Sequence, residues 1–166
     1  MVLYSQTSPQ WATRIWWLLR IVGFDNAHVL DGGLTKWKLE QRSVSDQQTT
    51  YAPTQLTTTP RTGLMASKEE VLTAINNSKV CTINALRRTQ HTGQDKGEFG
   101  NYGRPGHISG SVNVPTAELV DSNTTTFLPA EHIASVFNEI SVDKACLLYT
   151  SPSPRDRSLS RMPSSA

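Results

Sequence analysis

The sequence lacks a hydrophobic run approaching the roughly 20 residues that a membrane-spanning helix needs. The longest, residues 15–22, is interrupted by Arg20. Only two cysteines occur, Cys81 and Cys146, which excludes a disulfide-dense secreted scaffold. The first residues also lack the basic-then-apolar layout of a signal peptide. We therefore expect a soluble protein in a reducing, cytoplasmic setting, with no membrane partner.

The sequence also lacks a large excess of positive or negative charge. The chain of 166 residues has 16 basic and 14 acidic residues and a net charge of +2, which gives no electrostatic case for a nucleic-acid partner. The four histidines are scattered and no Cys-x-x-Cys pair is present, so we expect no metal site. All ten glycines lie at or before Gly110. No phosphate-binding loop is evident, and we expect no cofactor.

The first segment alternates between strand and helix patterns. Residues 2–4 and 27–30 are predicted strands. Between them, Ser8 is the predicted N-cap of a helix, Pro9 its first residue and Gly23 its stop signal. After a turn at residues 31–33, residues 34–41 form a short amphipathic helix. The apolar positions predicted to face the core of this segment are Trp11, Ile15, Trp16, Trp17, Leu18, Leu19, Val22 and Trp37.

A change in composition separates this segment from a second α/β segment. Residues 43–63 are dominated by Thr, Gln, Ser and Pro, as in an extended linker. Further on, Ser67 and Glu70 have capping-box spacing, and Pro129 precedes a helical pattern with Ile133, Val136, Phe137 and Ile140 inward. Predicted strands lie at residues 64–65, 80–83, 111–114 and 145–149, with a long polar loop at 84–105.

Three separated motifs resemble the rhodanese family of sulfurtransferases. Residues 106–115, Gly-His-Ile-Ser-Gly-Ser-Val-Asn-Val-Pro, are similar to the family's Gly-His-Ile-Pro-Gly-Ala motif. Residues 14–19 fit its Arg-x-Trp-Trp-x-Leu helix, and residues 29–34 with Trp37 fit its Val-Leu-Asp-Gly-Gly strand end and Trp-bearing helix. The motifs appear in an order that the family permits. The resemblance covers roughly residues 2–149.

The resemblance implies an α/β fold with a rhodanese-like parallel sheet covered by helices, present as two partial domains. Residues 1–46 are similar to the C-terminal half of the non-catalytic first domain of tandem sulfurtransferases. Residues 47–63 are then the linker, and residues 64–149 the N-terminal part of the second domain. Residues 150–166 resemble translated adapter sequence and are predicted to be a disordered, artefactual tail. We expect the chain to be a fragment.

The family's chemistry requires a cysteine that accepts sulfane sulfur from thiosulfate or 3-mercaptopyruvate. The resulting persulfide passes the sulfur to a thiol or to cyanide, without a metal. The family places this cysteine directly after a strand of the form apolar-apolar-Tyr. Here Ser5 and Thr150 hold those positions, and neither hydroxyl can carry a persulfide. We expect no catalytic residue in the chain as written, and we interpret Cys81 and Cys146 as buried strand residues.

Basic residues near the motifs are the predicted substrate-binding groups. The family often has Asp-Ala-Arg after the strand that corresponds to residues 80–83, with the arginine binding the anionic donor. This sequence has Asn-Ala-Leu at residues 84–86, followed by Arg87 and Arg88. We select Arg88 and Arg104 as candidates, while a solvated loop charge is an equally good interpretation of each. We interpret His107 and Asp31 as structural residues.

Two other functions remain open at this point. The chain could be a non-catalytic rhodanese-like module that binds or regulates, with Thr150 native. It could also be an unrelated small α/β binding domain, which three ordered motifs disfavour. The order of the two partial domains raises a structural question, because the C-terminal half of one domain precedes the N-terminal part of the next. The two halves could close into one permuted domain, in which residues 2–4 and 145–149 would compete for one central strand position.

Overall fold

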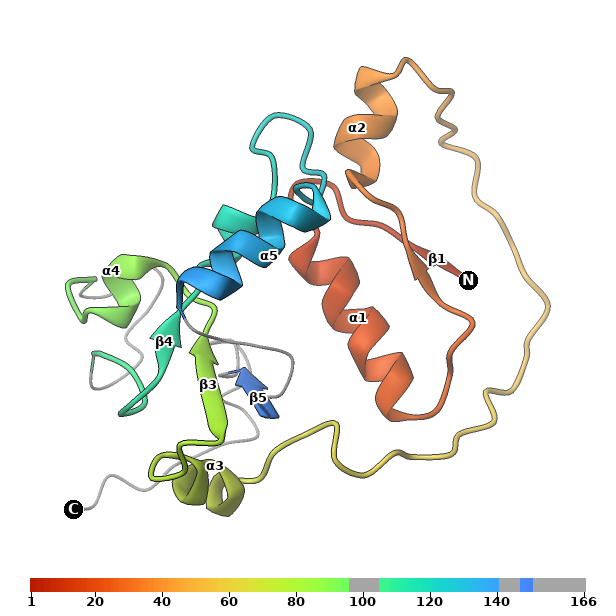
Figure 1. Cartoon of the computed structure of the whole chain (residues 1–166). Helices are drawn as coiled ribbons and strands as arrows, with labels where there is room; N and C mark the ends of the chain where they lie inside the picture. The colour runs from red at the N-terminus through yellow and green to blue at the C-terminus, as the bar shows by residue number, and fades with distance from the viewer. Residues whose placement is uncertain (96–104, 141–146, 151–166) are drawn as a thin grey trace. The chain divides into compact units, whose positions relative to one another are not determined.

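The computed structural model describes residues 1–95, 105–140 and the backbone of the strand at 147–150. The chain divides into two compact units (Figure 1). Unit 1 comprises residues Met1–Ala66 and a later piece, Leu119–Pro129, which we call the return segment. Unit 2 comprises Ser67–Glu118 and the described residues from Ala130 onward. The predicted domain boundaries at residues 46, 63 and 149 remain a prediction.

Unit 1 contains a β-α-β motif followed by a second helix. Strand β1 spans Val2–Leu3, helix α1 spans Gln10–Ile21, strand β2 spans His28–Val29 and helix α2 spans Gly33–Leu39. The two strands pair in parallel, with Val2 opposite His28 and Leu3 opposite Val29. Helix α1 makes the crossover between them and contacts both strands. The predicted order of strand and helix is therefore confirmed.

The ends of α1 show one small correction and one confirmation. Pro9, not Ser8, is the N-cap residue, and the Ser8 hydroxyl accepts only a long hydrogen bond of 3.4 Å from the Gln10 amide. Pro9 nevertheless has helical backbone angles, φ −64° and ψ −18°, as predicted for the first residue of the helix, so the two cap positions differ by one residue only. At the other end Gly23 has a φ of +87°, and the Phe24 amide donates to the Leu19 carbonyl at 2.8 Å. This is a glycine-terminated Schellman arrangement, and it confirms the predicted stop signal at Gly23.

The prediction that the tryptophans are core residues is wrong for two of them. Trp11 and Trp17 are 46% and 41% exposed, and Ile15 and Leu18 on the same helix are also exposed. Only Ala12 is fully buried in α1. Trp16 is half-buried and donates its indole N–H to the Ala27 carbonyl at 3.1 Å. A two-stranded sheet is too narrow to cover the wide apolar face of this helix.

The predicted linker region, residues 43–63, forms neither helix nor strand. Its end is tied to α1, because the Thr59 and Arg61 amides donate to the carbonyls of Val22 and Ile21 at 2.9 and 2.8 Å. The Arg61 guanidinium also hydrogen-bonds Asp25, which lowers the pKa of that carboxyl. The short strand predicted at residues 64–65 is absent, since these residues lie in turns and bends.

Unit 2 contains a three-stranded parallel sheet. Its elements are helix α3 (Lys68–Ala74), strand β3 (Val80–Asn84), helix α4 (Arg88–His91), strand β4 (Val112–Asn113), the 3-10 helix η1 (Thr116–Leu119), helix α5 (Ala130–Glu139) and strand β5 (Leu147–Thr150). The strand order is β4-β3-β5. The central strand β3 buries Thr82, Ile83 and Asn84, as expected for a strand with neighbours on both sides.

Helix α3 begins with the predicted capping box. The Glu70 amide donates to the Ser67 hydroxyl at 3.2 Å, and the Ser67 amide donates to the Glu70 carboxylate at 2.6 Å. The latter bond lowers the pKa of Glu70, because it favours the ionised carboxylate. Two of the amides that lack an intrahelical partner at the helix start are thereby satisfied.

Replacing Ser67 by alanine is expected to lower the free energy of unfolding of unit 2 by about 1 kcal/mol, since the Glu70 amide loses its acceptor. Amide hydrogen exchange across α3, followed by NMR, measures the change. Thr73→Ala is the matched control, because it removes an exposed hydroxyl from the last turn of the same helix, where it donates to the Glu69 carbonyl and caps no free amide. An equal loss in both variants would contradict the capping role.

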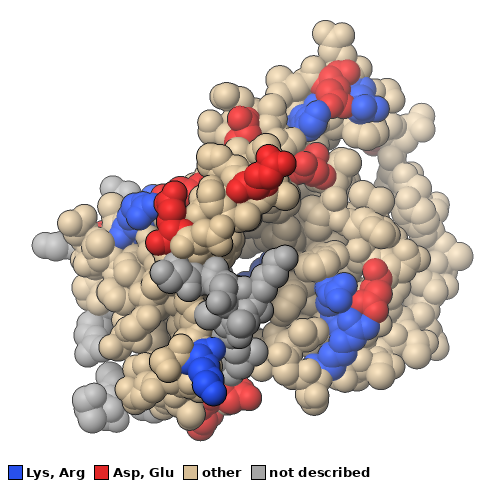
Figure 2. Space-filling model, in the orientation of Figure 1, with Lys and Arg blue, Asp and Glu red and all other residues tan. Residues whose placement is uncertain are grey.

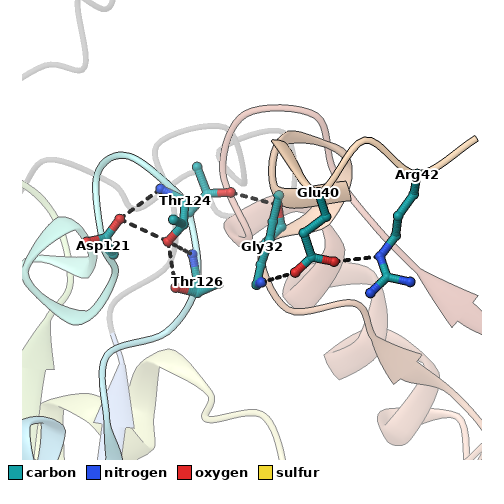
Figure 3. Close-up of polar contacts among 8 residues, drawn as sticks. Gly32, Glu40, Arg42, Asp121, Thr124 and Thr126 are labelled. Atoms are coloured by element: carbon teal, nitrogen blue, oxygen red, sulfur yellow. Dashed lines mark hydrogen bonds and ion pairs between the residues drawn. The ribbon is translucent and has the colours of Figure 1, made fainter. Parts of the chain in front are cut away.

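The return segment packs against the turn between β2 and α2 (Figure 3). Thr125 donates its hydroxyl to the Gly32 carbonyl at 2.9 Å, and the Phe127 amide donates to the Asp31 carboxylate at 2.8 Å. Within the segment, Asp121 accepts from the Thr124 amide and hydroxyl, and these bonds lower the pKa of its carboxyl. The interpretation of Asp31 as a structural turn residue agrees with this contact.

The long loop predicted at residues 84–105 is wrong in part, because Asn84 ends β3 and residues 88–91 form the short helix α4, while the other sequence predictions about unit 2 are largely confirmed. The patterns at residues 80–83, 111–114 and after Pro129 correspond to β3, β4 and α5. The inward positions predicted for α5 are its less exposed ones. The pattern at 145–149 corresponds to β5, except that residues 145 and 146 lie outside the described residues. Strands β1 and β5 belong to separate sheets, so the described strands do not form one permuted sheet.

Candidate functional site

The carboxyl ends of the three strands of unit 2 meet at one edge of the sheet. Asn84 of β3 lies opposite Asn113 of β4, and Ile83 lies opposite Thr150, the last residue of β5. We define the carboxyl edge as these strand ends together with residues 85–88, which follow β3. Parallel α/β sheets bind their ligands at this end of the strands. The position predicted for the sulfur-accepting residue, 150, therefore lies where such a site is expected.

Two asparagines brace the loop that follows β3. The Asn113 amide nitrogen donates to the carbonyls of Asn84 and Leu86, at 2.8 Å each. The Asn84 side chain in turn accepts from the Leu86 amide at 3.0 Å, and Asn84 is only 4% exposed. The hydrogen bonds of the buried Asn84 hold it in one geometry, whereas the buried Oδ1 of Asn113 has no hydrogen-bond partner among the described residues. The start of the loop is thus fixed to the neighbouring strand β4.

Arg88 comes directly after this braced turn. Its Nε and Nη2 donate to the two carboxylate oxygens of Glu118 at 2.8 Å each. The Arg88 side chain is 68% exposed. Leu86, at the position of the family's arginine, carries no charge and is half-buried. The substrate-binding role of Arg88 stays a prediction, and Arg104, the second predicted residue, lies outside the described residues.

Cys81 does not lie at the carboxyl edge. Cys81 pairs with Leu148, two positions before the pair of Ile83 and Thr150. With about 3.3 Å per residue, this places it roughly 7 Å back along the strand. Cys81 is half-buried, whereas the sequence predicted a buried residue. It forms no disulfide. Cys146 lies outside the described residues.

His107 of the Gly-His-Ile motif has a structural environment, as the sequence interpretation proposed. Its ring stacks on that of His91, with centroids 3.7 Å apart and planes inclined by 8°. Its Nδ1 donates to the His91 carbonyl at 2.7 Å. The His91 Nε2 lies 3.3 Å from the Ser111 carbonyl. The pair therefore connects α4 to the segment that enters β4.

Ser5 holds the position in unit 1 that corresponds to residue 150, and it is hydrogen-bonded within unit 1. Its hydroxyl donates to the Ser8 carbonyl, and its own carbonyl accepts from the Leu34 amide at 3.0 Å. A groove of about 390 Å³ lies beside the next residues of the chain. Its lining contains one ionisable group, Lys38, and no cysteine. The lining residues are Gln6, Thr7, Leu34, Thr35, Lys38 and Leu39.

Charged side chains form small mixed groups on the face shown in Figure 2. The described residues form ion pairs that include Arg61 with Asp25, Lys36 and Arg42 with Glu40, and Arg88 with Glu118. Within the described ranges, no group of three or more His, Cys, Asp or Glu side chains could hold a metal ion. None of the helices described there has the length and apolar character to cross a membrane.

Sequence reasoning did not identify Asn113 or Glu118 as neighbours of the site. The sequence predicts Asn113 only as one residue of the strand at 111–114. A polar residue at the end of a buried parallel strand, just before Pro115, is a signal that could have marked it. Glu118 gave no local signal, because its pairing with Arg88 spans 30 residues.

The geometry defines an α/β protein with parallel strands and a polar carboxyl edge, and comparison with solved structures gives the fold. The chain is similar to SseA of Escherichia coli, a 3-mercaptopyruvate sulfurtransferase of rhodanese fold, with a TM-score of 0.77 and 22% identity. The match covers 92% of this chain and 56% of SseA. An anaerobic ergothioneine biosynthesis enzyme from Chlorobium limicola matches with a TM-score of 0.75 and 14% identity, over 90% of this chain and 40% of the enzyme. The chain has the rhodanese fold, as the sequence predicted.

The curated relatives agree with the fold. A Mycobacterium bovis protein with the provisional name thiosulfate sulfurtransferase 1 is 26% identical over 153 residues, which are 87% of this chain and 53% of that protein. The rat thiosulfate sulfurtransferase is 26% identical over 133 residues, covering 80% of this chain and 44% of the rat protein. No family model matches the chain. The resemblance to rhodanese-type sulfurtransferases is confirmed, and the chain spans about half the length of these relatives.

Proposed function

We propose that the chain is part of a rhodanese-type sulfurtransferase that moves sulfane sulfur from thiosulfate or 3-mercaptopyruvate to a thiol or cyanide. The observation that carries this proposal is the register of β5 against β3, which brings residue 150 to the carboxyl edge. The curated relatives' names and the share of their length that the chain spans support it. A cytoplasmic location belongs to the same proposal.

The reaction explains why residue 150 decides activity. A cysteine thiolate attacks the outer sulfur of thiosulfate, an S–S bond forms, and sulfite leaves with the electron pair of the broken bond. The acceptor then attacks the outer sulfur of the persulfide and releases the thiolate. A threonine hydroxyl forms no persulfide, so the chain with Thr150 is inactive in this step. The remaining parts of the site still bind the donor.

Arg88 is the proposed donor-binding cation. Its planar guanidinium matches two oxygens of an oxyanion, and the braced turn at Asn84 and Leu86 sets where its backbone starts. Arg104 is the second proposed cation. The only basis for this proposal is its sequence position, just before the Gly-His-Ile motif.

Replacing Arg88 by alanine is expected to weaken thiosulfate binding roughly tenfold, because charge-assisted hydrogen bonds to an oxyanion are lost. Titration with thiosulfate, followed through the backbone amides of residues 85–88 and 112–118 by NMR, measures the dissociation constant. Arg42→Ala is the matched control, since Arg42 is also exposed and paired with a glutamate, in unit 1. Equal affinity in the Arg88→Ala variant and the unchanged chain would remove Arg88 from the site.

A further inference from the structure

Glu118 occupies the hydrogen-bonding groups of Arg88 that an oxyanion would use. The Nε and Nη2 of Arg88 point to Glu118 Oε1 and Oε2, with both distances 2.8 Å. This two-point arrangement is the one that a guanidinium offers to a carboxylate, sulfate or thiosulfate. An oxyanion that binds this side of Arg88 must therefore take the place of the Glu118 carboxylate.

Both partners of this pair are held by backbone contacts that do not depend on the pair itself. Arg88 follows the turn braced by Asn84 and Asn113. Glu118 lies in η1, whose first residue, Thr116, donates its amide to the Ala85 carbonyl at 3.2 Å. The Glu118 amide donates to the Pro115 carbonyl at 2.9 Å. Displacing the carboxylate therefore requires a side-chain rotation and leaves these backbone bonds in place.

The exposure of the pair shows that it is suited to exchange. The Arg88 side chain is 68% exposed and the Glu118 side chain 39% exposed. Water screens an ion pair at such a site and solvates both partners when they separate, so the pair contributes little to stability. A competing anion with comparable geometry can take over the guanidinium.

We propose that Glu118 is a specificity-determining residue that competes with the sulfur donor for Arg88. This inference rests on the proposed function and on Arg88 as its donor-binding cation. An anion displaces Glu118 only if it presents two oxygens to the Nε and Nη2 groups, as thiosulfate does. Thiocyanate, the product of transfer to cyanide, is linear and offers one terminal atom at a time. Glu118 thus admits the donor and excludes this product.

Replacing Glu118 by glutamine tests the competition. Removing the negative charge that competes for Arg88 is expected to tighten thiosulfate binding roughly fivefold, which corresponds to about 1 kcal/mol, the energy of two unit charges about 4 Å apart in water. Thiocyanate binding is expected to become measurable, so that the ratio of thiosulfate to thiocyanate affinity falls. Isothermal titration calorimetry with sodium thiosulfate and sodium thiocyanate gives both affinities.

The matched control is Glu69→Gln, which makes the same change of charge on α3, before β3. It is expected to leave both affinities unchanged. An equal gain in this control, or no gain in Glu118→Gln, would overturn the proposal. So would a gain that persists in the double variant Arg88→Ala with Glu118→Gln, because the effect is expected to act through Arg88.

The unchanged chain provides a second measurement, independent of whether any variant folds. The Arg88 Nε–H signal in a nitrogen-proton NMR spectrum reports its hydrogen bond to Glu118. Thiosulfate is expected to shift this signal, and thiocyanate at the same ionic strength is expected not to. Equal shifts with both anions would contradict selection by Glu118. Loss of thiosulfate binding in Arg88→Ala, with unchanged affinity in Glu118→Gln, would remove this inference and leave the proposed function standing.

Discussion

The variant Thr150→Cys is expected to transfer sulfur from thiosulfate to cyanide at least about a thousandfold faster than the unchanged chain, because a covalent nucleophile is typically worth more than this in rate. Residue 150 ends β5 beside Ile83, at the carboxyl edge. The loop start beside it is already braced by Asn84 and Asn113. The substitution supplies the sulfur atom that a persulfide requires. Thiocyanate production, followed by its coloured iron complex, measures the rate.

The control for this gain is Thr150→Ser, which changes the same residue and keeps a hydroxyl. It is expected to stay as inactive as the unchanged chain. Adding Cys81→Ser to Thr150→Cys is expected to leave the gained rate intact, since Cys81 lies two positions away from the edge. A rate in Thr150→Cys no higher than that of Thr150→Ser would contradict the assignment of residue 150.

The variant Gly33→Ala is expected to lower the free energy of unfolding of unit 1 by about 3 kcal/mol, through backbone strain and a steric clash. Gly33 is buried and has a φ of +51°, which disfavours any side chain. A Cβ here would also lie 2.3 Å from the Ser5 carbonyl oxygen, so the backbone would have to move. That oxygen accepts the Leu34 amide, and the movement would break this bond.

The variant Gly63→Ala separates these two causes. Gly63 has a φ of +81°, but a Cβ there meets nothing within 4 Å, so only the backbone strain of about 1 kcal/mol is expected. Urea unfolding followed by tryptophan fluorescence suits both variants, because all four tryptophans lie between residues 11 and 37, in unit 1. Equal losses in Gly33→Ala and Gly63→Ala would show that the contact with Ser5 costs nothing.

Local patterns were sufficient for most of the elements. The capping box at Ser67 and Glu70 and the stop at Gly23 depend on residues within one helical turn, and both form as predicted. The buried strand β3 was evident from its apolar run between polar segments. The rhodanese resemblance added the parallel sheet. These features need no knowledge of distant contacts, so a sequence reading can supply them.

Contacts between distant residues account for what the sequence could not predict. The periodicity of α1 indicated an apolar face, but it could not show that the two-stranded sheet leaves Trp11 and Trp17 exposed. The return segment belongs to unit 1 through bonds from Thr125 and Phe127 to residues more than 90 positions earlier. At the site, Glu118 pairs with Arg88 across 30 residues. Such pairings depend on the folded topology.

The central claim is that residue 150, at the carboxyl edge of the unit 2 sheet, is the sulfur-accepting position. Peptide mass spectrometry of Thr150→Cys after treatment with thiosulfate tests it most directly, with the excess donor removed and the free thiols then alkylated. The account predicts one added sulfur atom on residue 150, located by fragmentation of its peptide, which also contains Cys146, and none on Cys81 or Cys146. An unmodified residue 150, or sulfur on Cys81 instead, would contradict it.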